Sequence, residues 1–489
     1  MNKPVRRVAI AMLVLFSLLV LNANYVQVVK ATAYQQDPGN TRVLLEEYER
    51  QRGSIVVDGR AVASSRATPD DRLDYLRTYV NGPMFAHSTG YYSLIYSTAA
   101  IERAEDDLLS GSSDSLFVRR LTDLFTGQEP KGGNVELTLN ARAQQAAYQA
   151  LTDSGATGAV VALDPQTGAI LAMVSTPSYD PNLLSLHDPQ AIRDYSNSLD
   201  AAEVDPRLNR ATQDNFPPGS VFKVIIAAAA LEEGIEPESM IPAPDVLTLP
   251  QTSSTIRNFG GSSCNGGADD TLIHALTISC NTAFAQLGID LGEAKLRDIA
   301  ERFGIDDQGY EMPLPVAQST LGDIESAAAL GQSSIGQRDV RLTPIEAANI
   351  VATIGNGGTL YQPYLVAERQ APDLTVIDDV EPVEIREAIS SDVAAALTEM
   401  MVSVVANGSG VNAQIEGVEV AGKTGTAEVD EGIAPHAWFA GFAPADNPQI
   451  AVSVFLANGG DSGSETTGGR AAAPIARAVM AAFLGTGGG

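Results

Sequence analysis

Residues 159–174 read AVVALDPQTGAILAMV, and this stretch decides how the chain is expected to fold. Residues 159–163 and 170–174 are short apolar runs rich in Val, Ile and Leu, which favour β-strands. The intervening Asp164-Pro165-Gln166-Thr167-Gly168 is typical of a tight turn. We therefore predict an antiparallel hairpin at the start of a domain that covers residues 155–489.

Three further strands are expected at the other end of that domain, over residues 418–428, 437–443 and 450–457. The region between the two groups is mainly helical, and a closing helix is expected over residues 473–484. Two early and three late strands indicate one sheet built from both ends of the domain. The predicted fold is an α/β domain with a mostly antiparallel five-stranded sheet covered by helices.

Residues 36–150 mix short helices, strands and turns. An amphipathic helix is expected over residues 41–52, a strand over 54–59 and another over 135–139. Asn140 then suits the N-cap of a helix that continues through residue 151. This region holds no convincing catalytic cluster, so we predict an α+β pedestal or interaction domain.

The N-terminus predicts export. Lys3, Arg6 and Arg7 precede an uncharged segment over residues 8–29, which is long enough to span a bilayer as a helix. The basic flank predicts that residues 1–7 are cytoplasmic. A cleaved signal peptide is the alternative, because residues 31–33 read Ala-Thr-Ala, a small-x-small pattern.

Composition excludes several classes of partner. The net charge of −29 and the absence of a basic run argue against nucleic acid, whose phosphates need a basic face. The four histidines are scattered and there is no C-x-x-C motif, so no metal or other cofactor is predicted. In an exported domain, Cys264 and Cys280 can form a disulfide, and two buried free thiols are the alternative.

The few lysines of the chain indicate where a side chain could act as a base. The chain has six lysines, which leaves 25 arginines among its 31 basic residues (31 − 6). Only an ammonium can be tuned into a base by burial and neighbouring cations, because guanidinium does not lose its proton in proteins. Lys223 and Lys423 stand in SVFK and KTGT. We interpret Lys223 as a proton acceptor and Lys423 as its electrostatic neighbour.

Ser220 follows Phe216-Pro217-Pro218-Gly219, which breaks the chain, and precedes an apolar helix expected over residues 221–233. Positions i and i+3 share one face of a helix, so Lys223 is expected to reach the Ser220 hydroxyl and to activate it as a nucleophile. The alternative is a capping serine followed by a surface lysine, and a lone S-x-x-K motif is weak evidence.

Two more elements complete the cluster. Lys423-Thr424-Gly425 is expected on a strand, where the glycine allows close approach of a ligand. Two stretches supply a hydroxyl and an amide as S-x-N, at residues 263–265 and 279–281. We favour Ser279 and Asn281, because they separate two predicted helices, whereas the first stretch lies in a Gly/Ser-rich loop.

One motif is rejected. Residues 460–463 read GDSG, the nucleophile loop of chymotrypsin-like proteases. That machinery needs a His and an Asp upstream on β-barrels, and this chain is half helical with no histidine in a matching context.

In chain order, S-x-x-K, S-x-N and K-T-G resemble the motif set of the β-lactamases and penicillin-binding proteins. Residues 159–173, PSYDPN at 177–182, Gly336-Gln337 with Thr343-Pro344, and AWFAGF at 437–442 resemble class B penicillin-binding proteins, in particular the actinobacterial type. The resemblance covers essentially the whole chain. It implies a penicillin-binding, serine β-lactamase-like transpeptidase domain on a dimerisation-like pedestal, and favours one uncleaved transmembrane anchor with the catalytic domain outside the cell.

The resemblance also implies roles. Ser220 would attack the D-Ala-D-Ala amide of a peptidoglycan stem peptide, and Lys223 would be the general base. Ser279 and Asn281 would relay the proton and hold the donor, and Lys423 would tune the network. Thr424 and Thr426, around Gly425, would bind the terminal carboxylate, while the N–H groups of Ser220 and Thr426 would form an oxyanion hole.

It further implies inhibition by β-lactams and a place in cell-wall synthesis with division or elongation proteins. Because no glycosyltransferase domain is seen upstream, polymerisation is expected from a separate SEDS-type glycosyltransferase. Residues 52–55 (RGSI) resemble the start of the family's pedestal, but Val-Val-Asp-Gly at residues 56–59 replaces the commoner Asp-Arg-x-Gly, so pedestal details stay open. The alternatives are a carboxypeptidase or β-lactamase, for which no E-x-x-L-N stretch follows Ser279, and a non-catalytic scaffold or β-lactam sensor.

Overall fold

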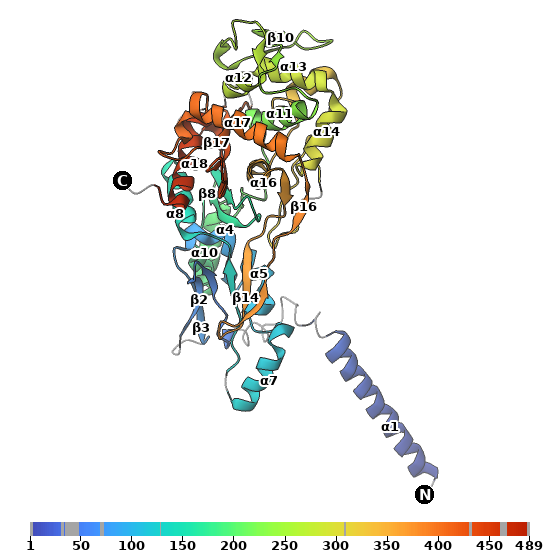
Figure 1. Ribbon diagram of the computed structural model, residues 1–489. Helices are drawn as coiled ribbons and strands as arrows, with labels where there is room; N and C mark the ends of the chain where they lie inside the picture. Colours follow the sequence, from blue (N-terminus) through green and yellow to red (C-terminus); the bar gives the residue numbers. More distant parts are fainter. Residues whose placement is uncertain are drawn as a thin grey trace.

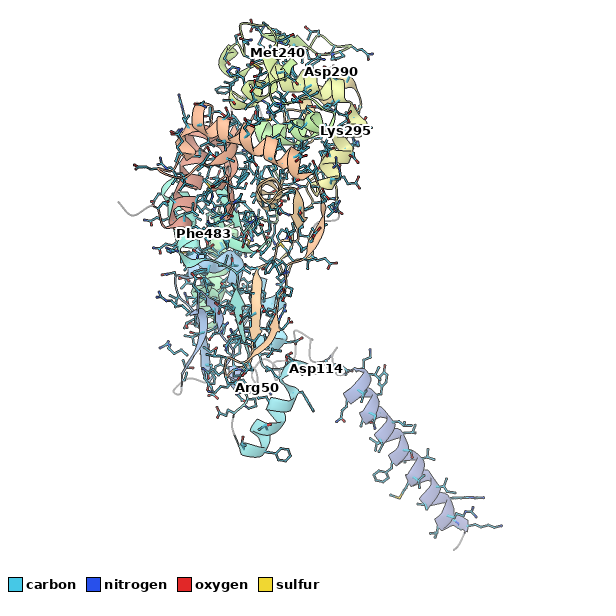
Figure 2. All side chains as sticks on the ribbon, viewed as in Figure 1. Arg50, Asp114, Met240, Asp290, Lys295 and Phe483 are labelled. Atoms are coloured by element: carbon cyan, nitrogen blue, oxygen red, sulfur yellow. A yellow bond between two sulfur atoms is a disulfide. The ribbon has the colours of Figure 1, made fainter. Side chains whose placement is uncertain are left out.

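The computed structural model describes residues 3–30, 34, 48–68, 73–127, 129–307, 310–429, 433–459 and 467–486. Figure 1 shows an elongated molecule in which the pedestal and a helical lobe (residues 223–302) lie at opposite ends of the folded body. In Figure 2, Arg50 and Asp114 mark the pedestal end, whereas Met240 and Asp290 mark the helical lobe. The helix expected over residues 41–52 and the GDSG motif lie largely or wholly outside the described residues.

The large sheet has the predicted origin. Its strand order is β17-β18-β19-β7-β8, and every pairing is antiparallel. The early strands are β7 (Gly158–Leu163) and β8 (Ile170–Thr176). The late strands are β17 (Ala421–Ala427), β18 (His436–Ala443) and β19 (Ile450–Leu456). The prediction of one five-stranded sheet from both ends of the domain is confirmed.

Helices cover both faces of this sheet, which explains why its strands read as continuous apolar runs. Val160 and Ala162 pack with α8 (Ala141–Asp153) and α18 (Gly468–Leu484) on one face. The alternate residues Ala159 and Val161 join the core on the other face, where α16 (Pro344–Gly355) contacts β7, β18 and β19. Because successive side chains on a strand point to opposite faces, a two-sided core needs apolar residues at every position.

Two predicted boundaries were wrong. The closing helix α18 begins at Gly468, five residues before the expected start, and carries Pro474 inside it. Strand β17 begins at Ala421 rather than 418, because residues 415–418 form a turn closed by a bridge between Ile415 and Val418.

The pedestal is organised around a six-stranded sheet in the order β15-β14-β6-β1-β2-β3. Four of its strands come from the N-terminal region: β1 (Ile55–Val57), β2 (Arg60–Ala67), β3 (Tyr75–Tyr79) and β6 (Asn134–Leu137). The other two, β14 (Val366–Gln370) and β15 (Val376–Asp379), come from far along the chain. The sequence did not predict this hairpin, which joins the two parts of the molecule through hydrogen-bonded backbone.

Asn140 caps α8 as expected, because its side chain accepts a hydrogen bond from the N–H of Ala143 at 3.1 Å. At the N-terminus, α1 (Lys3–Asn24) continues into a π-helical turn at Tyr25–Val29. Residues 3–29 form the one helix among the described residues that is long and apolar enough to cross a membrane. This length and composition fit an N-terminal membrane anchor.

Candidate active site

Ser220 lies where the chain enters the buried core of the helical lobe. It belongs to a 3-10 turn, η3 (Gly219–Phe222), and the α-helix α11 (Lys223–Glu232) begins only at Lys223. The prediction of an α-helix from residue 221 was therefore wrong by two residues. Ser220 is half-buried, whereas Lys223 is fully buried. The hydroxyl thus remains open to a ligand while the amine is removed from water.

Lys223 is held mainly by the S-x-N turn. Its Nζ donates to the backbone oxygen of Ser279 at 2.7 Å, to the Ser279 hydroxyl at 3.2 Å and to Asn281 Oδ1 at 2.7 Å. In the described part of the chain, its hydrogen bonds do not include one to Ser220, which was the expected contact. Since Ser220 and Lys223 are three residues apart on one helical segment, they remain neighbours on the same face.

Ser279 and Asn281 sit in the predicted turn between two helices, α12 (Leu272–Thr277) and α13 (Asn281–Leu291). Ser279 has a φ of 63°, in the left-handed region that few non-glycine residues adopt. Such backbone conformations are enriched at functional sites. The alternative S-x-N stretch lies elsewhere: Asn265 is exposed and its side chain donates to the backbone oxygen of Asp269.

Lys423 enters the cluster from β17. Its Nζ donates to the Ser279 hydroxyl at 2.9 Å and to the backbone oxygen of Thr424 at 3.1 Å. The Ser279 oxygen therefore lies between the two ammonium groups. The structure brings together Lys223, Ser279, Asn281 and Lys423, which the sequence places up to 200 residues apart (423 − 223).

Both lysines are buried beside neutral partners. All the acceptors described above are hydroxyl, amide or backbone oxygens, and burial without a counter-ion disfavours the charged form of an amine. Burial, and then the positive charge of Lys423, lower the pKa of Lys223 well below its ordinary value. Burial alone lowers the pKa of Lys423 to about 7.

Glycine lets β17 and the Ser220 turn approach each other closely. A Cβ on Gly219 would lie 2.4 Å from the backbone oxygen of Thr426, and one on Gly425 would lie 2.5 Å from that of Pro218. Gly219 also adopts a φ of 53°. Neither position therefore accepts a side chain without a shift of the backbone. Trp438 strengthens the same contact, because its Nε1 donates to the backbone oxygen of Pro217 at 2.9 Å.

The two threonines of β17 have separate partners. The Thr424 hydroxyl lies 2.6 Å from that of Ser409, which follows α17 (Ser391–Asn407). The Thr426 hydroxyl accepts a hydrogen bond from the N–H of Gly468 at 3.4 Å. Ser409 was not singled out from the sequence, because nothing in its local pattern signals contact with a strand that begins 12 residues later (421 − 409).

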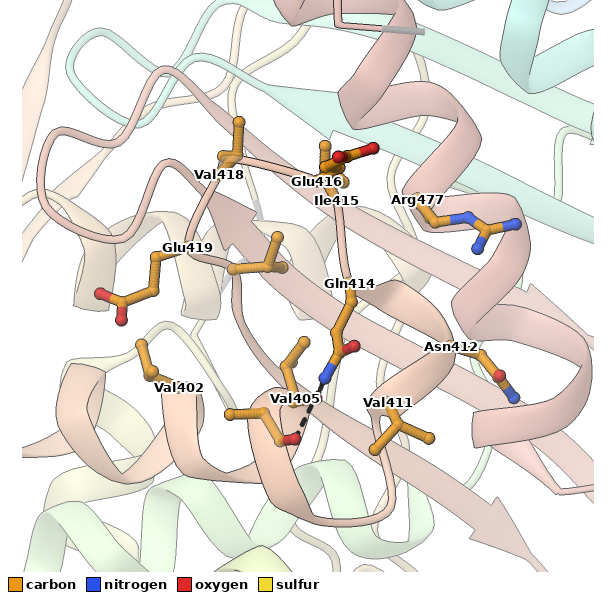
Figure 3. Close-up of a pocket in the computed structure, with 12 residues that line it drawn as sticks. Val402, Val405, Val411, Asn412, Gln414, Ile415, Glu416, Val418, Glu419 and Arg477 are labelled. Carbon is orange, nitrogen blue, oxygen red and sulfur yellow. Dashed lines mark hydrogen bonds between the residues drawn. The ribbon is translucent and has the colours of Figure 1, made fainter. Parts of the chain in front are cut away.

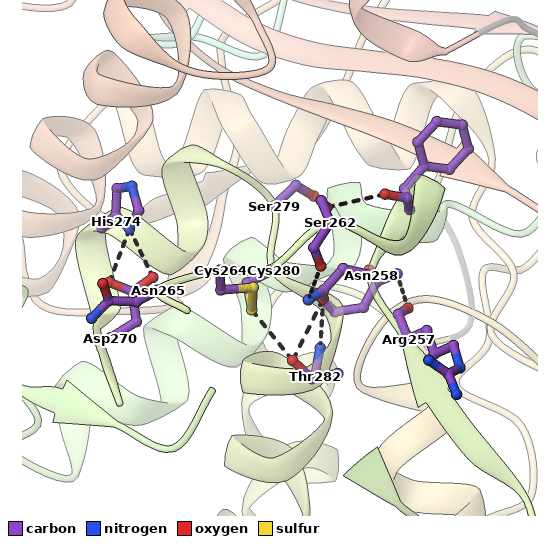
Figure 4. Close-up of a disulfide and its surroundings, with 12 residues drawn as sticks. Arg257, Asn258, Ser262, Cys264, Asn265, Asp270, His274, Ser279, Cys280 and Thr282 are labelled. Atoms are coloured by element: carbon purple, nitrogen blue, oxygen red, sulfur yellow. Dashed lines mark hydrogen bonds and ion pairs between the residues drawn. A yellow bond between two sulfur atoms is a disulfide. The ribbon is translucent and has the colours of Figure 1, made fainter. Parts of the chain in front are cut away.

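Cys264 and Cys280 form a disulfide with an S–S distance of 1.99 Å (Figure 4). Cys280 stands between Ser279 and Asn281, so the bridge ties the loop at residues 258–270 to the S-x-N turn. Among the described residues, no group of three or more His, Cys, Asp or Glu side chains is placed to hold a metal ion.

The pocket in Figure 3 lies apart from this cluster. It is lined by residues of α17, of the segment 411–420 and of α18, including Asn412, Glu416 and Arg477. None of the lysine, serine and asparagine residues of the cluster lines it.

The fold and the cluster define a class of protein: an α/β domain in which a buried helix lysine, three residues after a half-buried serine, shares an S-x-N turn with a strand lysine. Residues 158–481 match the penicillin binding protein transpeptidase domain. Residues 52–135 match the penicillin binding protein A dimerisation domain. The chain belongs to the family of penicillin-binding proteins with a transpeptidase domain.

Relatives agree over the full length. The chain is 49% identical to the peptidoglycan D,D-transpeptidase PbpA of Mycolicibacterium smegmatis, with 99% of each chain covered. It is 47% identical to PbpA of Mycobacterium tuberculosis, again with 99% of each covered. The structure of penicillin-binding protein A from M. tuberculosis as a ceftriaxone acyl-enzyme complex superposes with a TM-score of 0.87 at 47% identity, over 90% of this chain and 100% of that one.

Proposed function

We propose that this protein is a peptidoglycan D,D-transpeptidase that cross-links stem peptides in cell-wall synthesis through an acyl-enzyme on Ser220. β-Lactams would acylate the same serine. The observation that carries the proposal is a buried pair of lysines that both bond to the Ser279 hydroxyl, one of which, Lys223, lies three residues after the half-buried Ser220. The names of the relatives support it, since those proteins are D,D-transpeptidases and one was solved as a β-lactam acyl-enzyme.

In the first half-reaction, Ser220 Oγ attacks the carbonyl carbon between the two terminal D-alanines. Neutral Lys223 accepts the hydroxyl proton as the new C–O bond forms. The proton then passes through the Ser279 hydroxyl to the departing amine of the last D-alanine as the C–N bond breaks. The 3.2 Å and 2.9 Å contacts of the Ser279 hydroxyl with Lys223 and Lys423 support this proposed relay.

In the second half-reaction, an amine from a neighbouring stem peptide attacks the ester carbonyl. The attacking nitrogen gives up a proton to neutral Lys223, which passes it to Ser220 Oγ as the ester C–O bond breaks, and the new amide is the cross-link. The N–H groups of Ser220 and Thr426 would stabilise the oxyanion in both halves, and one such donor is typically worth about 3 kcal/mol. The close approach of Gly219 to Thr426 supports this pairing.

The carboxylate of the donor peptide would bind the Thr424 and Thr426 hydroxyls on either side of Gly425. Asn281 stands at the start of α13, and its Oδ1 accepts from Lys223. There it would help to hold the backbone of the donor peptide. Lys423 would contribute positive charge near the carboxylate. These roles assign every residue of the three motifs.

We further propose residues 8–29 as the transmembrane anchor, residues 1–7 as a cytoplasmic tail, residues 36–150 as the pedestal and residues 155–489 as an extracytoplasmic catalytic domain. Lys3, Arg6 and Arg7 support this orientation through the excess of basic residues on the cytoplasmic side. A SEDS-type glycosyltransferase and division or elongation proteins are the proposed partners.

A labelled penicillin tests the proposal. Full-length protein in detergent should form a stable adduct, and mass spectrometry should place it on Ser220. Ser220→Ala should abolish labelling and should fail to rescue a deletion strain. Rapid release of the label would indicate a hydrolase instead, and full rescue by Ser220→Ala would indicate a scaffold.

A further inference from the structure

Helix α13 begins at the S-x-N turn without a cap of its own. The first N–H groups of an α-helix have no partner inside the helix, and a Ser, Thr, Asp or Asn at the N-cap usually accepts from them. Here the N-cap residue is Cys280, which makes no side-chain cap hydrogen bond and whose sulfur is bonded to Cys264. The acceptor must therefore come from elsewhere.

Asn258 supplies it from a different element. Its Oδ1 accepts from the N–H of Asn281 at 2.8 Å and from the N–H of Thr282 at 3.2 Å. The other end of the same amide is also fixed, because Nδ2 donates to the backbone oxygen of Ser262 at 3.0 Å. The residue is 6% exposed. Figure 4 shows Asn258 between Thr282 and the strand residue Arg257.

The neighbouring backbone fixes the side chain of Asn281. The Nδ2 of Asn281 donates to the backbone oxygen of Arg257, the last residue of β11 (Thr255–Arg257), at 3.1 Å. Its Oδ1 is the amide atom left to accept from Lys223 Nζ at 2.7 Å. Asn258 thus bonds to the backbone N–H of Asn281, and the backbone oxygen of Arg257 bonds to its side-chain nitrogen.

We propose that Asn258 is a positioning residue for the acylation reaction. It caps α13 in place of Cys280 and so holds Asn281 with its amide oxygen on Lys223. This inference rests on the proposed function, because Lys223 is the base whose environment Asn258 controls. Asn258 itself touches none of the reacting atoms.

Substitution of Asn258 is expected to shift the pH dependence of acylation in a defined direction, which a simple loss of stability would not do. An amide oxygen that accepts from Lys223 favours the ammonium over the amine. Losing that contact lowers the pKa of Lys223 further. The acid limb of the acylation profile should therefore move to lower pH, while the maximal rate falls because the base and Asn281 are displaced.

The test measures the second-order rate constant for acylation of full-length protein by a fluorescent penicillin across pH. Asn258→Ala should lower the maximal rate constant about ten-fold or more, as expected for a displaced catalytic group. Its acid limb should move in the same direction as that of Asn281→Ala. Asn258→Asp, which keeps an acceptor for the helix N–H groups, should restore most of the maximal rate.

Two comparisons complete the design. The double variant Asn258→Ala with Asn281→Ala should lose little beyond Asn281→Ala alone, because the two residues act through one contact. Asn265→Ala is the matched control, since this exposed residue lies in the same loop and bonds only within it among the described residues. If Asn258→Ala does not fold, Asn258→Leu removes the acceptor while filling a similar volume.

Wild-type-like acylation by Asn258→Ala or Asn258→Leu would overturn the inference. So would full additivity with Asn281→Ala, or an unmoved acid limb. Failure of the wild-type protein to label on Ser220 would instead overturn the proposed function, so the two failures are distinguishable.

Discussion

Lys223 and Lys423 meet at one oxygen. The Nζ of Lys223 lies 3.2 Å from the Ser279 hydroxyl and the Nζ of Lys423 lies 2.9 Å from it, although the two lysines come from a helix and from the edge strand of the sheet. Two ammonium groups this close and this buried repel each other, which favours loss of a proton from one of them. The same hydroxyl can then pass a proton between the base and a leaving group.

Lys223→Arg should slow acylation severely although the positive charge is retained. A guanidinium does not lose its proton in proteins and so cannot accept one from Ser220. The expected loss in acylation rate is about a thousand-fold, within the usual contribution of a general base. Stopped-flow labelling with a fluorescent penicillin measures it.

Lys295→Arg is the control for that substitution. Lys295 lies on the helical lobe (Figure 2) and pairs with Glu232 and Glu233, so an arginine there should acylate at the wild-type rate. An Lys223→Arg protein that acylates normally would refute the assignment of the base.

Burial of Lys423 predicts a pH dependence of stability. Its pKa falls from an ordinary 10.5 to about 7 in the folded protein. Between those values the unfolded chain binds more protons than the folded one, so the free energy of unfolding rises with pH. Below about pH 7 both states are protonated and this contribution is constant. Relative to Lys423→Met, the wild-type melting temperature should therefore increase from pH 7 to pH 10 in scanning calorimetry. If the melting temperatures of the two proteins changed with pH in the same way, the lowered pKa of Lys423 would be contradicted.

Reduction of the disulfide should destabilise the catalytic domain. The bridge closes a loop with a sequence separation of 16, worth about 3 kcal/mol in the chain-entropy model. Acylation should also slow, because the bridge joins the loop that carries Asn258 to the S-x-N turn. Denaturant unfolding of wild-type and Cys264→Ser with Cys280→Ser protein measures the first effect, and penicillin labelling the second. Equal midpoints would show that the bridge is dispensable.

The pedestal should depend on Glu102. This fully buried carboxylate accepts from Arg52 at 2.7 Å and from Arg77 at 2.6 Å. Burial opposes its ionisation, but the two arginines outweigh burial and hold the pKa of Glu102 below its ordinary value. Among the described residues, Glu102→Gln leaves buried Arg77 without an anion and Arg52 with only Asp106, and it should cost about 3–5 kcal/mol. Urea unfolding measures this cost.

The control for Glu102→Gln is Glu293→Gln, which breaks an exposed pair with Arg297 within one helix and should cost about 0.5 kcal/mol or less. Acylation of the folded fraction should be unchanged in both variants. A loss near the control value would mean that the arginines find other partners.

Much of the fold could be predicted from the sequence, because the patterns that indicate its strands and motifs lie within short stretches of the chain. Residues 159–163 are apolar at every position and residues 450–456 at every position except Ser453, as expected for strands that are covered on both faces. The S-x-x-K, S-x-N and K-T-G motifs were readable for the same reason, since each places its functional groups within four consecutive residues. Export and the two cysteines together predicted a bridge, and the structure contains it.

Contacts between segments that are far apart in the chain could not be predicted from the sequence. The β14–β15 hairpin pairs with β6 across more than 200 residues of chain, and backbone hydrogen bonds leave no residue-specific mark on the sequence. The 3-10 turn at Ser220 begins beside Gly336, whose backbone oxygen accepts from the N–H of Gly219 at 3.0 Å. This contact with a remote part of the chain is a feature that the local pattern of residues 221 and 222 does not reveal.

The amino-acid sequence by itself determined which residues we propose to carry the chemistry and which strands form the large sheet, because short motifs and strand periodicity are properties of neighbouring residues. Only the tertiary structure decided that Lys223 bonds to Ser279 and Asn281, and that Asn258 caps α13. Those contacts join elements whose separation along the chain is large, and the energy that selects them comes from burial and hydrogen bonding in the folded state.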